Sequence, residues 1–175
     1  INKPSKARIG YIAQEAPSGM MTPEEVVLAS ATERAELLAE LETCEDMDRM
    51  GDVHERLLAI DAYSAPARAA KILNGLGFDE EMQKRPVDSF SGGWKMRAAL
   101  AGLLLLEPDL LLLDEPTNGL DPPQIREMRQ VLREYAKDGR TVILSSHLLG
   151  EVEQTCTDVV VMHRGMVVAT GTVEQ

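Results

Sequence analysis

The fold of this 175-residue chain is decided by the stretch Leu-Leu-Leu-Leu-Asp-Glu at residues 110–115. Four consecutive leucines form a short, continuously apolar run, which is typical of a strand buried on both faces of a parallel sheet. Two carboxylates follow directly, at the strand end where open α/β sheets bind their ligands. The stretch therefore predicts an α/β fold with acidic chemistry at the carboxyl edge of a parallel sheet.

Composition narrows the class of protein further. Hydrophobic residues make up 44% of the chain and aromatic residues only 3%, so aliphatic side chains and Met must build the core. The formal net charge is −11. We therefore expect no direct binding to nucleic acid, because phosphate contacts need clustered Lys and Arg. The acidic run between Glu33 and Asp61 is interpreted as a solvated helical face.

Cysteine usage and hydropathy favour a cytoplasmic location. Cys44 and Cys156 are too few for a disulfide framework or a zinc site, which fits a reducing compartment. No signal peptide opens the chain, and charged residues interrupt the most apolar stretch, residues 98–113, so it does not predict a membrane span. We expect a soluble protein that reaches a membrane only through a partner.

The first part of the chain combines one strand with the start of a helical region. Residues 8–14 are typical of a strand that ends at Gln14. The sequence Thr-Pro-Glu-Glu at residues 22–25 is a capping box with proline at the first helical position, which predicts a helix start. Helical periodicity then continues to Leu41.

Two more helices are predicted before the sheet resumes. One follows a helical pattern over residues 50–60, and the next is predicted to begin with Ser64 as its cap and to end at Gly75. We assign residues 22–88 to a helical insert within a single domain. The sheet-containing core then comprises residues 1–14 and 89–175.

The remainder of the chain alternates helices and strands, as parallel sheets require. The predicted elements are a helix over 91–106, a strand over 110–113, a helix from Pro122 to Gly139, a second buried strand over 141–145 and a short helix over 148–155. Residues 159–163 and 166–170 alternate around a tight turn at Arg164-Gly165, which predicts a C-terminal β-hairpin.

Asp114 and Glu115 are the leading candidates for chemistry. In nucleotide hydrolysis, a carboxylate at the end of a buried strand can hold Mg²⁺, which bridges two phosphates. A second carboxylate can orient or deprotonate the attacking water. The alternative is that both residues only cap a loop before Pro116, since a dipeptide motif alone has false positives.

Ser91, Gly92 and Gly93 form a second candidate site. Two glycines let backbone N–H groups approach an anion closely, the serine adds a hydroxyl, and the following helix points its positive end at the same place. The alternative is an ordinary helix cap. Trp94, next in the chain, could stack on a base or pack against the helical insert.

In order and spacing, these motifs resemble the ATPase cassette of the ABC superfamily over nearly the whole chain. The resemblance implies a P-loop NTPase-type parallel sheet with ATP and Mg²⁺ as cofactors. It implies that Asp114 is a metal ligand and Glu115 a catalytic residue. In the family, the segment that matches Ser91 to Gly93 binds the nucleotide of a second, partner cassette.

Three further positions gain a role from the same resemblance. Gln14 matches a glutamine that contacts Mg²⁺ and senses the γ-phosphate. His147 matches a switch histidine that contacts the γ-phosphate, and Asp121 matches a residue of the loop that crosses the dimer interface. Without that context, Gln14 would be a surface glutamine and His147 an ordinary histidine at a strand end.

One element of the family pattern does not occur. No Gly-Lys-Ser/Thr sequence is present in the chain, and this is the loop whose backbone N–H groups and lysine cradle phosphates. We therefore expect an N-terminally truncated cassette that shows little ATP turnover alone.

The two halves resemble different branches of the family. The front half, including Phe90 and Trp94, is similar to the first cassette of ABC-F proteins, a soluble branch that acts on ribosomes. The back half, from Gly119 onward, is similar to ATPase subunits of membrane exporters, which indicates a chimera joined near residues 117–122. Three functions stay open: a ribosome-associated ABC-F factor, an exporter subunit bound to a membrane permease, and an inactive fragment.

Overall fold

The computed structural model describes residues 8–12, 17–137 and 139–173. The elements follow one another as β1 (Ile9–Ile12), α1 (Pro23–Ala29), α2 (Thr32–Thr43), α3 (Met47–Ala59), α4 (Ala65–Gly75), the short 3₁₀ helices η1 (Met82–Lys84) and η2 (Val87–Ser89), α5 (Gly92–Leu105), β2 (Leu110–Asp114), α6 (Pro122–Lys137), β3 (Thr141–Ser145), α7 (Leu149–Thr155), β4 (Asp158–His163) and β5 (Met166–Thr172).

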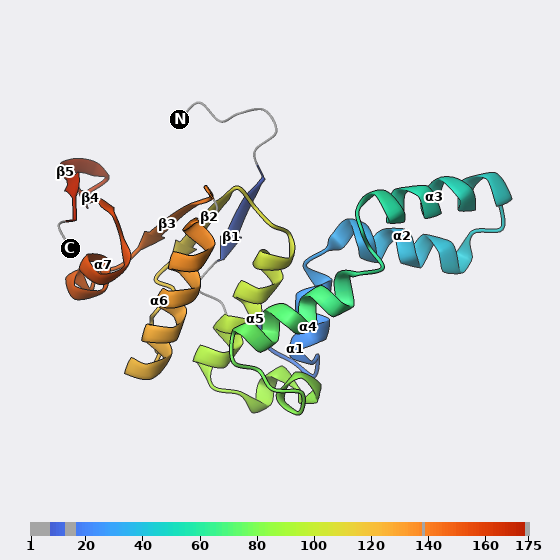
Figure 1. The fold of residues 1–175 in the computed structure, drawn as a ribbon, viewed down its shortest axis with the longest axis horizontal. Coiled ribbons are helices and arrows are strands. Elements are labelled where there is room, and N and C mark those ends of the chain that lie inside the picture. Colours follow the sequence, from blue (N-terminus) through green and yellow to red (C-terminus); the bar gives the residue numbers. More distant parts are fainter. Residues whose placement is uncertain (1–7, 13–16, 138, 174–175) are drawn as a thin grey trace.

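Two separate sheets form from the described strands. The strands β1, β2 and β3 lie side by side in that order, and both pairs are parallel. The strands β4 and β5 form an antiparallel hairpin at the C-terminal end of the fold (Figure 1). Arg164 and Gly165 in its turn have φ of 49° and 77°, as tight hairpin turns require. The predicted α/β class, parallel sheet and hairpin are confirmed.

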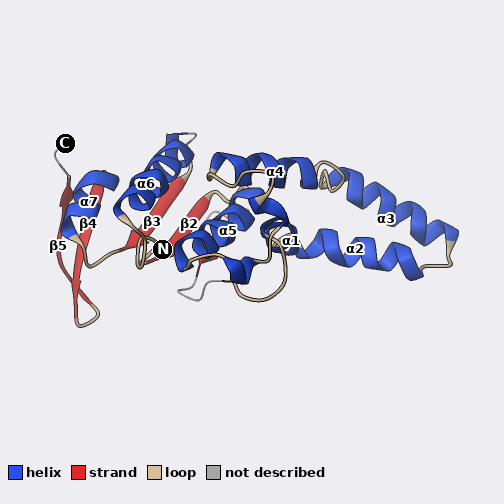
Figure 2. Cartoon of the chain, turned by 90° about the horizontal axis from the view of Figure 1, so that it is seen from below, coloured by secondary structure: helices blue, strands red, loops and turns tan. Residues whose placement is uncertain are grey.

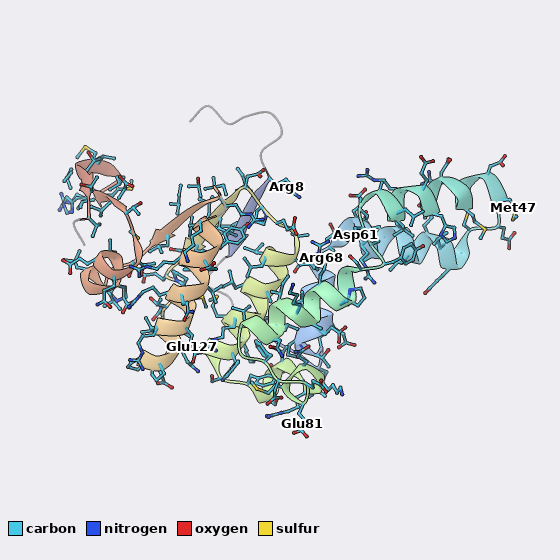
Figure 3. The ribbon with its side chains drawn as sticks, in the orientation of Figure 1. Arg8, Met47, Asp61, Arg68, Glu81 and Glu127 are labelled. Carbon is cyan, nitrogen blue, oxygen red and sulfur yellow. The ribbon has the colours of Figure 1, made fainter. Side chains whose placement is uncertain are left out.

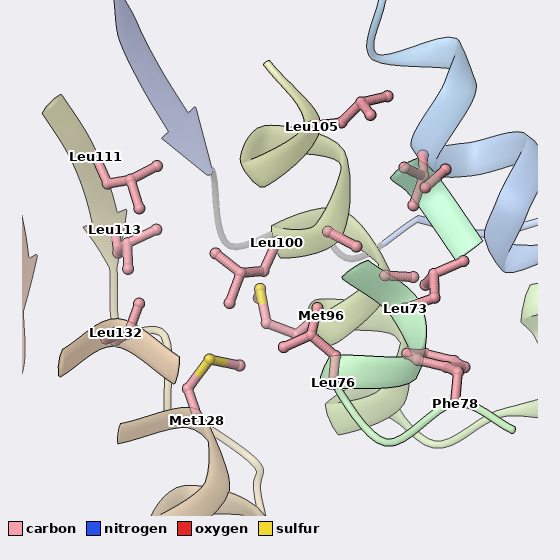
Figure 4. Close-up of a cluster of buried hydrophobic side chains, with 14 residues drawn as sticks. Leu73, Leu76, Phe78, Met96, Leu100, Leu105, Leu111, Leu113, Met128 and Leu132 are labelled. Carbon is pink, nitrogen blue, oxygen red and sulfur yellow. The ribbon is translucent and has the colours of Figure 1, made fainter. Parts of the chain in front are cut away.

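The core lies between the parallel sheet and the helices α4, α5 and α6 (Figure 4). Leu111 and Leu113 of β2 point into it and are at most 3% exposed. On the helical side, Leu73 of α4 and Leu100 of α5 are equally buried. Each such side chain contributes about 1.5–3 kcal/mol through removal from water, so this layer fixes the position of β2.

The strands are not buried on both faces, which corrects the sequence-based expectation. Along β2 the buried leucines alternate with the half-buried Leu110 and Leu112. Along β3, which was expected to be buried, Ile143 is 51% exposed. The reason is that the core helices pack against one face only, so the side chains of the opposite face lack cover within the described residues.

The helix start at Thr22 is confirmed. Its side chain accepts a hydrogen bond from the Glu25 N–H, and the Glu25 carboxylate accepts one from the Thr22 N–H. The helix does not continue to Leu41. It is interrupted at Ser30 and Ala31, and a second helix, α2, begins at Thr32. Ser64 precedes α4 but does not cap it with its side chain, since its hydroxyl bonds to Asp61 instead.

The helices α2 and α3 form an arm that extends away from the sheet (Figures 1 and 2). No residue of α2 is fully buried, and Met47, 80% exposed, lies at the far end of the arm (Figure 3). Ion pairs join the two helices, from Arg49 to Glu40 at 2.5 Å and from Arg56 to Glu33 at 2.6 Å. The acidic run is therefore a solvated face, as expected. Among the described residues, no helix is long and apolar enough to span a membrane.

Candidate functional site

Asp114 and Glu115 lie at the carboxyl end of β2, next to the end of β3. The register of the two parallel strands places Asp114 opposite Ser145. The Ser145 hydroxyl donates to Asp114 Oδ1 at 2.5 Å and accepts from the Glu115 N–H at 3.0 Å. One side chain therefore fixes both the carboxylate of the first acidic residue and the backbone of the second.

The backbone of Glu115 adopts an unusual conformation, with φ of 48°. This left-handed region costs about 1–2 kcal/mol for a residue with a side chain, and such outliers cluster at functional sites. Nδ1 of His147 lies 3.0 Å from Oε1 and 2.9 Å from Oε2 of the Glu115 carboxylate. The structure thus brings Asp114, Glu115 and His147 into one group at the sheet edge.

Asp114 is the residue of this group that could hold a magnesium ion, together with phosphates. No cluster of three or more His, Cys, Asp or Glu side chains that could enclose a metal occurs among the described residues. Mg²⁺ does not need one, because it keeps several waters and takes one or two carboxylates together with substrate phosphates. Ser145 engages one carboxylate oxygen of Asp114, and no described side chain engages the other.

Ser91 lies at the start of α5 without acting as a side-chain cap. Its backbone is extended, with φ of −66° and ψ of 162°, and its hydroxyl makes no capping hydrogen bond. A Cβ added at Gly92 would meet nothing within 4 Å. The N-terminus of α5 is therefore open to an approaching group at Gly92, and the helix-cap interpretation of Ser91 lacks its hydrogen bond.

Gly93 serves a different purpose from Gly92. A Cβ at Gly93 would lie 2.5 Å from Leu120 Cδ2 and 2.6 Å from Gln124 Oε1. The same Gln124 oxygen accepts a hydrogen bond from the Asp121 N–H at 3.2 Å. A Cβ here would push aside the ends of the Leu120 and Gln124 side chains, so the glycine lets the loop that carries Asp121 lie close to the start of α5 in the same chain.

The sequence-based site residues fall into two groups that no described hydrogen bond or ion pair joins. One group contains Asp114, Glu115 and His147, and the other contains the segment 91–93 with Asp121. Gln14 lies outside the described residues. Sequence reasoning missed Ser145, although alignment of the two apolar strands by their carboxyl ends places it opposite Asp114.

An ion pair lies close to Ser91 in the chain. Lys95, one turn into α5, lies 2.7 Å from a carboxylate oxygen of Asp88. The hydrogen bond from Lys95, together with one from the backbone of Gly19, holds the pKa of Asp88 below its usual value. The pair joins η2 to the first turn of α5 and so orders the approach to Ser91.

Comparison with known proteins decides the family. A family model described as "ABC transporter" matches residues 1–118. The chain belongs to the ABC transporter family. Members of this family are ATPase cassettes that bind ATP and generally pair with a second cassette.

Within the family, this cassette is homologous to ABC-F proteins over most of its length. It is 38% identical over 164 residues to ATP-binding cassette sub-family F member 2 of Mus musculus, which covers 91% of this chain and 26% of that protein. It is 40% identical over 147 residues to Probable ATP-binding protein YheS of Escherichia coli (strain K12), with 82% and 23% covered. The cassette therefore spans about a quarter of the length of these relatives.

Solved structures share the fold. The ATP-binding cassette MJ0796, in a dimeric post-hydrolysis state bound to ADP and Pi, matches with a TM-score of 0.66 and 19% identity over 97% of this chain and 64% of that one. An ATP binding subunit of an ABC transporter matches with a TM-score of 0.68 and 25% identity over 95% and 59%. The arrangement of sheet and helices is thus that of ABC cassettes.

Proposed function

We propose that this cassette binds ATP and that Glu115 accepts a proton from the water that attacks the γ-phosphate. The observation that carries the proposal is the group at the sheet edge, in which Ser145 holds Asp114 and Glu115 together and His147 contacts the Glu115 carboxylate. A positioned carboxylate within hydrogen-bond reach of its proton is what general base catalysis requires.

The other members of the group receive complementary roles. Asp114 would hold Mg²⁺ through its free carboxylate oxygen, and the metal would supply charge neutralisation between the phosphates. His147, whose side chain is 66% exposed, would contact the γ-phosphate after it leaves Glu115. Gln14 would contact the same metal and water, as the family pattern implies.

Ser91, Gly92 and Asp121 are proposed to act across an interface between two cassettes. The open N-terminus of α5 is an anion site through its N–H groups and its dipole. No described hydrogen bond or ion pair links Ser91 to Asp114, Glu115 or His147 of the same chain, which supports a role toward the nucleotide of a partner. Gly93 would hold the loop of Asp121 against this surface.

The phosphates of a bound ATP need backbone N–H groups and a lysine in addition to the residues described so far. The chain contains no Gly-Lys-Ser/Thr sequence, and such loops supply the N–H groups and the lysine that bind the β- and γ-phosphates. We propose that the 175 residues alone give no appreciable Mg²⁺-dependent turnover and that a segment with this loop restores it. Turnover by the 175 residues alone, abolished by Glu115→Gln, would contradict this.

The biological setting proposed first is a ribosome-associated ABC-F factor. The support is the identity of 37–43% to proteins such as Protein GCN20 of Saccharomyces cerevisiae, which is 43% identical over 120 residues, 68% of this chain and 16% of that protein. The alternative is the nucleotide-binding subunit of an exporter, favoured by the sequence after residue 118. Co-sedimentation of the completed protein with ribosomes, or its capture by a membrane permease, distinguishes the two.

The role of Ser91 is tested by association. Ser91→Arg places a bulky side chain at a close backbone approach, so ATP-driven pairing with a complete cassette should weaken while the monomer stays folded. Light scattering with and without ATP measures the pairing. Gly51→Arg is the matched control, because it adds the same side chain on α3, where a Cβ meets nothing within 4 Å. Equal pairing of wild type and Ser91→Arg would show that Ser91 has no such role.

A further inference from the structure

A pocket of about 460 Å³ lies between the end of α4, α5 and α6, and none of its lining residues belongs to the candidate site. Its lining combines apolar side chains with a buried guanidinium. The residues that matter here are Leu76, Trp94, Arg97, Glu127, Met128 and Val131. Pockets that are mostly apolar with a few convergent polar groups are the usual form of ligand sites.

Arg97 is a rigid element of this pocket. The residue is 2% exposed, and its Nη1 donates to the carbonyl of Leu76 at 3.1 Å. Its guanidinium carbon lies 4.5 Å from the centre of the Trp94 ring, in a cation–π contact. Trp94 in turn packs edge-on against Phe78 at 4.8 Å. The guanidinium is therefore fixed in place before any ligand arrives.

The Nη2 atom of Arg97 is buried, and its N–H groups have no aligned hydrogen-bond acceptor. Glu127 of α6 provides the counter-charge, with Oε2 at 2.6 Å from Nη2, but this oxygen lies off the N–H directions. The Glu127 side chain is 62% exposed, and in Figure 3 it lies on the side of α6 turned toward α4 and α5. The buried cation thus has a replaceable, poorly aligned partner.

The energetics of the two partners are unequal. A buried charge without a partner is strongly destabilising, so Arg97 requires an anion at all times. The Glu127 carboxylate is mostly exposed, so it can return to solvent once another anion has taken its place on Arg97. An incoming carboxylate that aligns with both N–H directions of the planar fork would bind more strongly.

We propose that this pocket binds a carboxylate carried on an apolar body. The carboxylate replaces Glu127 on Arg97, and the apolar part lies against Trp94, Met128 and Val131. A multiply charged anion such as a phosphate fits less well, because the lining is largely apolar and also contains Glu134. The proposal is independent of the function proposed for the sheet edge.

Trp94 is the single tryptophan of the chain, so its fluorescence reports directly on the pocket. The probe is 4-phenylbutyrate, with 4-phenylbutanol as its uncharged counterpart. We expect a saturable change in Trp94 emission with the acid and none with the alcohol. Absence of a saturable change with the acid, or an equal response to both probes, would overturn the proposal.

Substitution of Glu127 gives the sharpest test. Glu127→Gln removes the competing intramolecular carboxylate, so the acid should bind to the folded variant about fivefold more tightly, which corresponds to about 1 kcal/mol. Glu134→Gln is the matched control, because it removes another carboxylate of the lining that is paired with Lys137 at 2.6 Å. Equal affinity of Glu127→Gln and wild type would mean that the ion pair is only structural.

Two further binding experiments distinguish a small acid from the C-terminus of a partner protein as the source of the carboxylate. A short peptide that ends in phenylalanine with a free α-carboxylate is compared with the same peptide amidated at its end. Binding of the free-ended peptide alone supports a partner's chain end as the ligand, and binding of 4-phenylbutyrate without either peptide supports a small acid. Arg97→Met should abolish both, after circular dichroism shows that the variant is folded.

Discussion

The helix α5, which precedes β2, and the C-terminal elements α7 and β5 are built in opposite ways. In α5, eight residues are buried, and the helix packs against α1 and α4. In α7 no residue is buried, and every residue of β5 is exposed. The strand β2 follows α5, and β3 precedes α7, so Asp114 and Glu115 come directly after the packed region and their partner His147 comes directly before the exposed one.

This difference shows how the candidate site is supported. Asp114 and Glu115 follow leucines that hydrophobic burial holds in place. His147 follows β3, and the helix after it is held to α6 by polar contacts from Arg129 to Glu151 and Gln154. One half of the site is thus fixed by the core and the other by hydrogen bonds, which respond more readily to a ligand.

The largest expected effect comes from the packed side. Leu111→Ala removes a fully buried side chain from β2 and leaves a cavity, so the free energy of unfolding should fall by about 2–5 kcal/mol. The matched change on the exposed side is Val168→Ala in β5, at a residue that is 57% exposed, with an effect within about 0.5 kcal/mol. Urea denaturation measures both, and similar losses in the two variants would refute the comparison.

A smaller effect is expected where polar contacts join α7 to α6. Arg129 donates to Gln154 Oε1 at 2.6 Å and to Glu151 Oε2 at 3.1 Å. The ion pair is mostly buried, with 15% and 19% of the two side chains exposed. Arg129→Ala should lower stability by about 1–3 kcal/mol and increase amide hydrogen exchange in α7.

The control for Arg129 is Arg133→Ala, one turn later on the same helix. Its side chain is exposed, so exchange in α7 should stay at the wild-type rate. Hydrogen exchange followed by mass spectrometry separates a local opening of α7 from global unfolding. If both variants leave α7 equally protected, Arg129 does not anchor it.

Two glycines give the next test. A Cβ at Gly102 of α5 would lie 2.1 Å from Ser30 Oγ and 3.2 Å from Ser30 Cβ, whereas one at Gly150 of α7 would meet nothing within 4 Å. Gly102→Ala should therefore destabilise by about 1–3 kcal/mol through overpacking. Gly150→Ala should be neutral or stabilise by up to about 1 kcal/mol through helix propensity. Thermal denaturation shows whether the signs differ as expected.

The sequence predicts the features that depend on local chemistry and misses those that depend on tertiary packing. The capping box at Thr22, the start of α5 after Ser91 and the hairpin turn at Arg164 depend on local chemistry, and their predictions are confirmed. The interruption between α1 and α2 at Ser30 and the close approach of Leu120 to Gly93 depend on tertiary packing. The sequence pattern alone does not predict them.

Burial of the strands could not be predicted from residue type alone. Four leucines indicate an apolar strand, but which faces are covered depends on where the helices pack, and here they cover one. The pairing of Asp114 with Ser145 likewise depends on strand register. The boundaries of the helical insert stay predictions, and so do all the predicted site roles, those of Gln14, Ser91, Gly92, Gly93, Asp114, Glu115, Asp121 and His147.

The smallest expected effect concerns pH on the exposed side. Burial raises the pKa of Cys156, the residue that follows α7, above its ordinary 9.0. The folded state therefore keeps the thiol protonated to higher pH than the unfolded state does. The stabilising contribution is complete below pH 9 and is lost as pH rises through the folded pKa. Unfolding midpoints at pH 8 and pH 10 should differ more for wild type than for Cys156→Ser.

The most direct test of the account separates ATP binding from hydrolysis in the protein completed with a phosphate-binding loop. Glu115→Gln should lower phosphate release by about 10²–10⁴-fold, as loss of a general base does, while the dissociation constant for ATP stays near that of wild type. Glu107→Gln is the matched control, because Glu107 has the same φ of 48° outside the candidate site. Phosphate release by Glu115→Gln at the rate of wild type and Glu107→Gln would contradict the central claim.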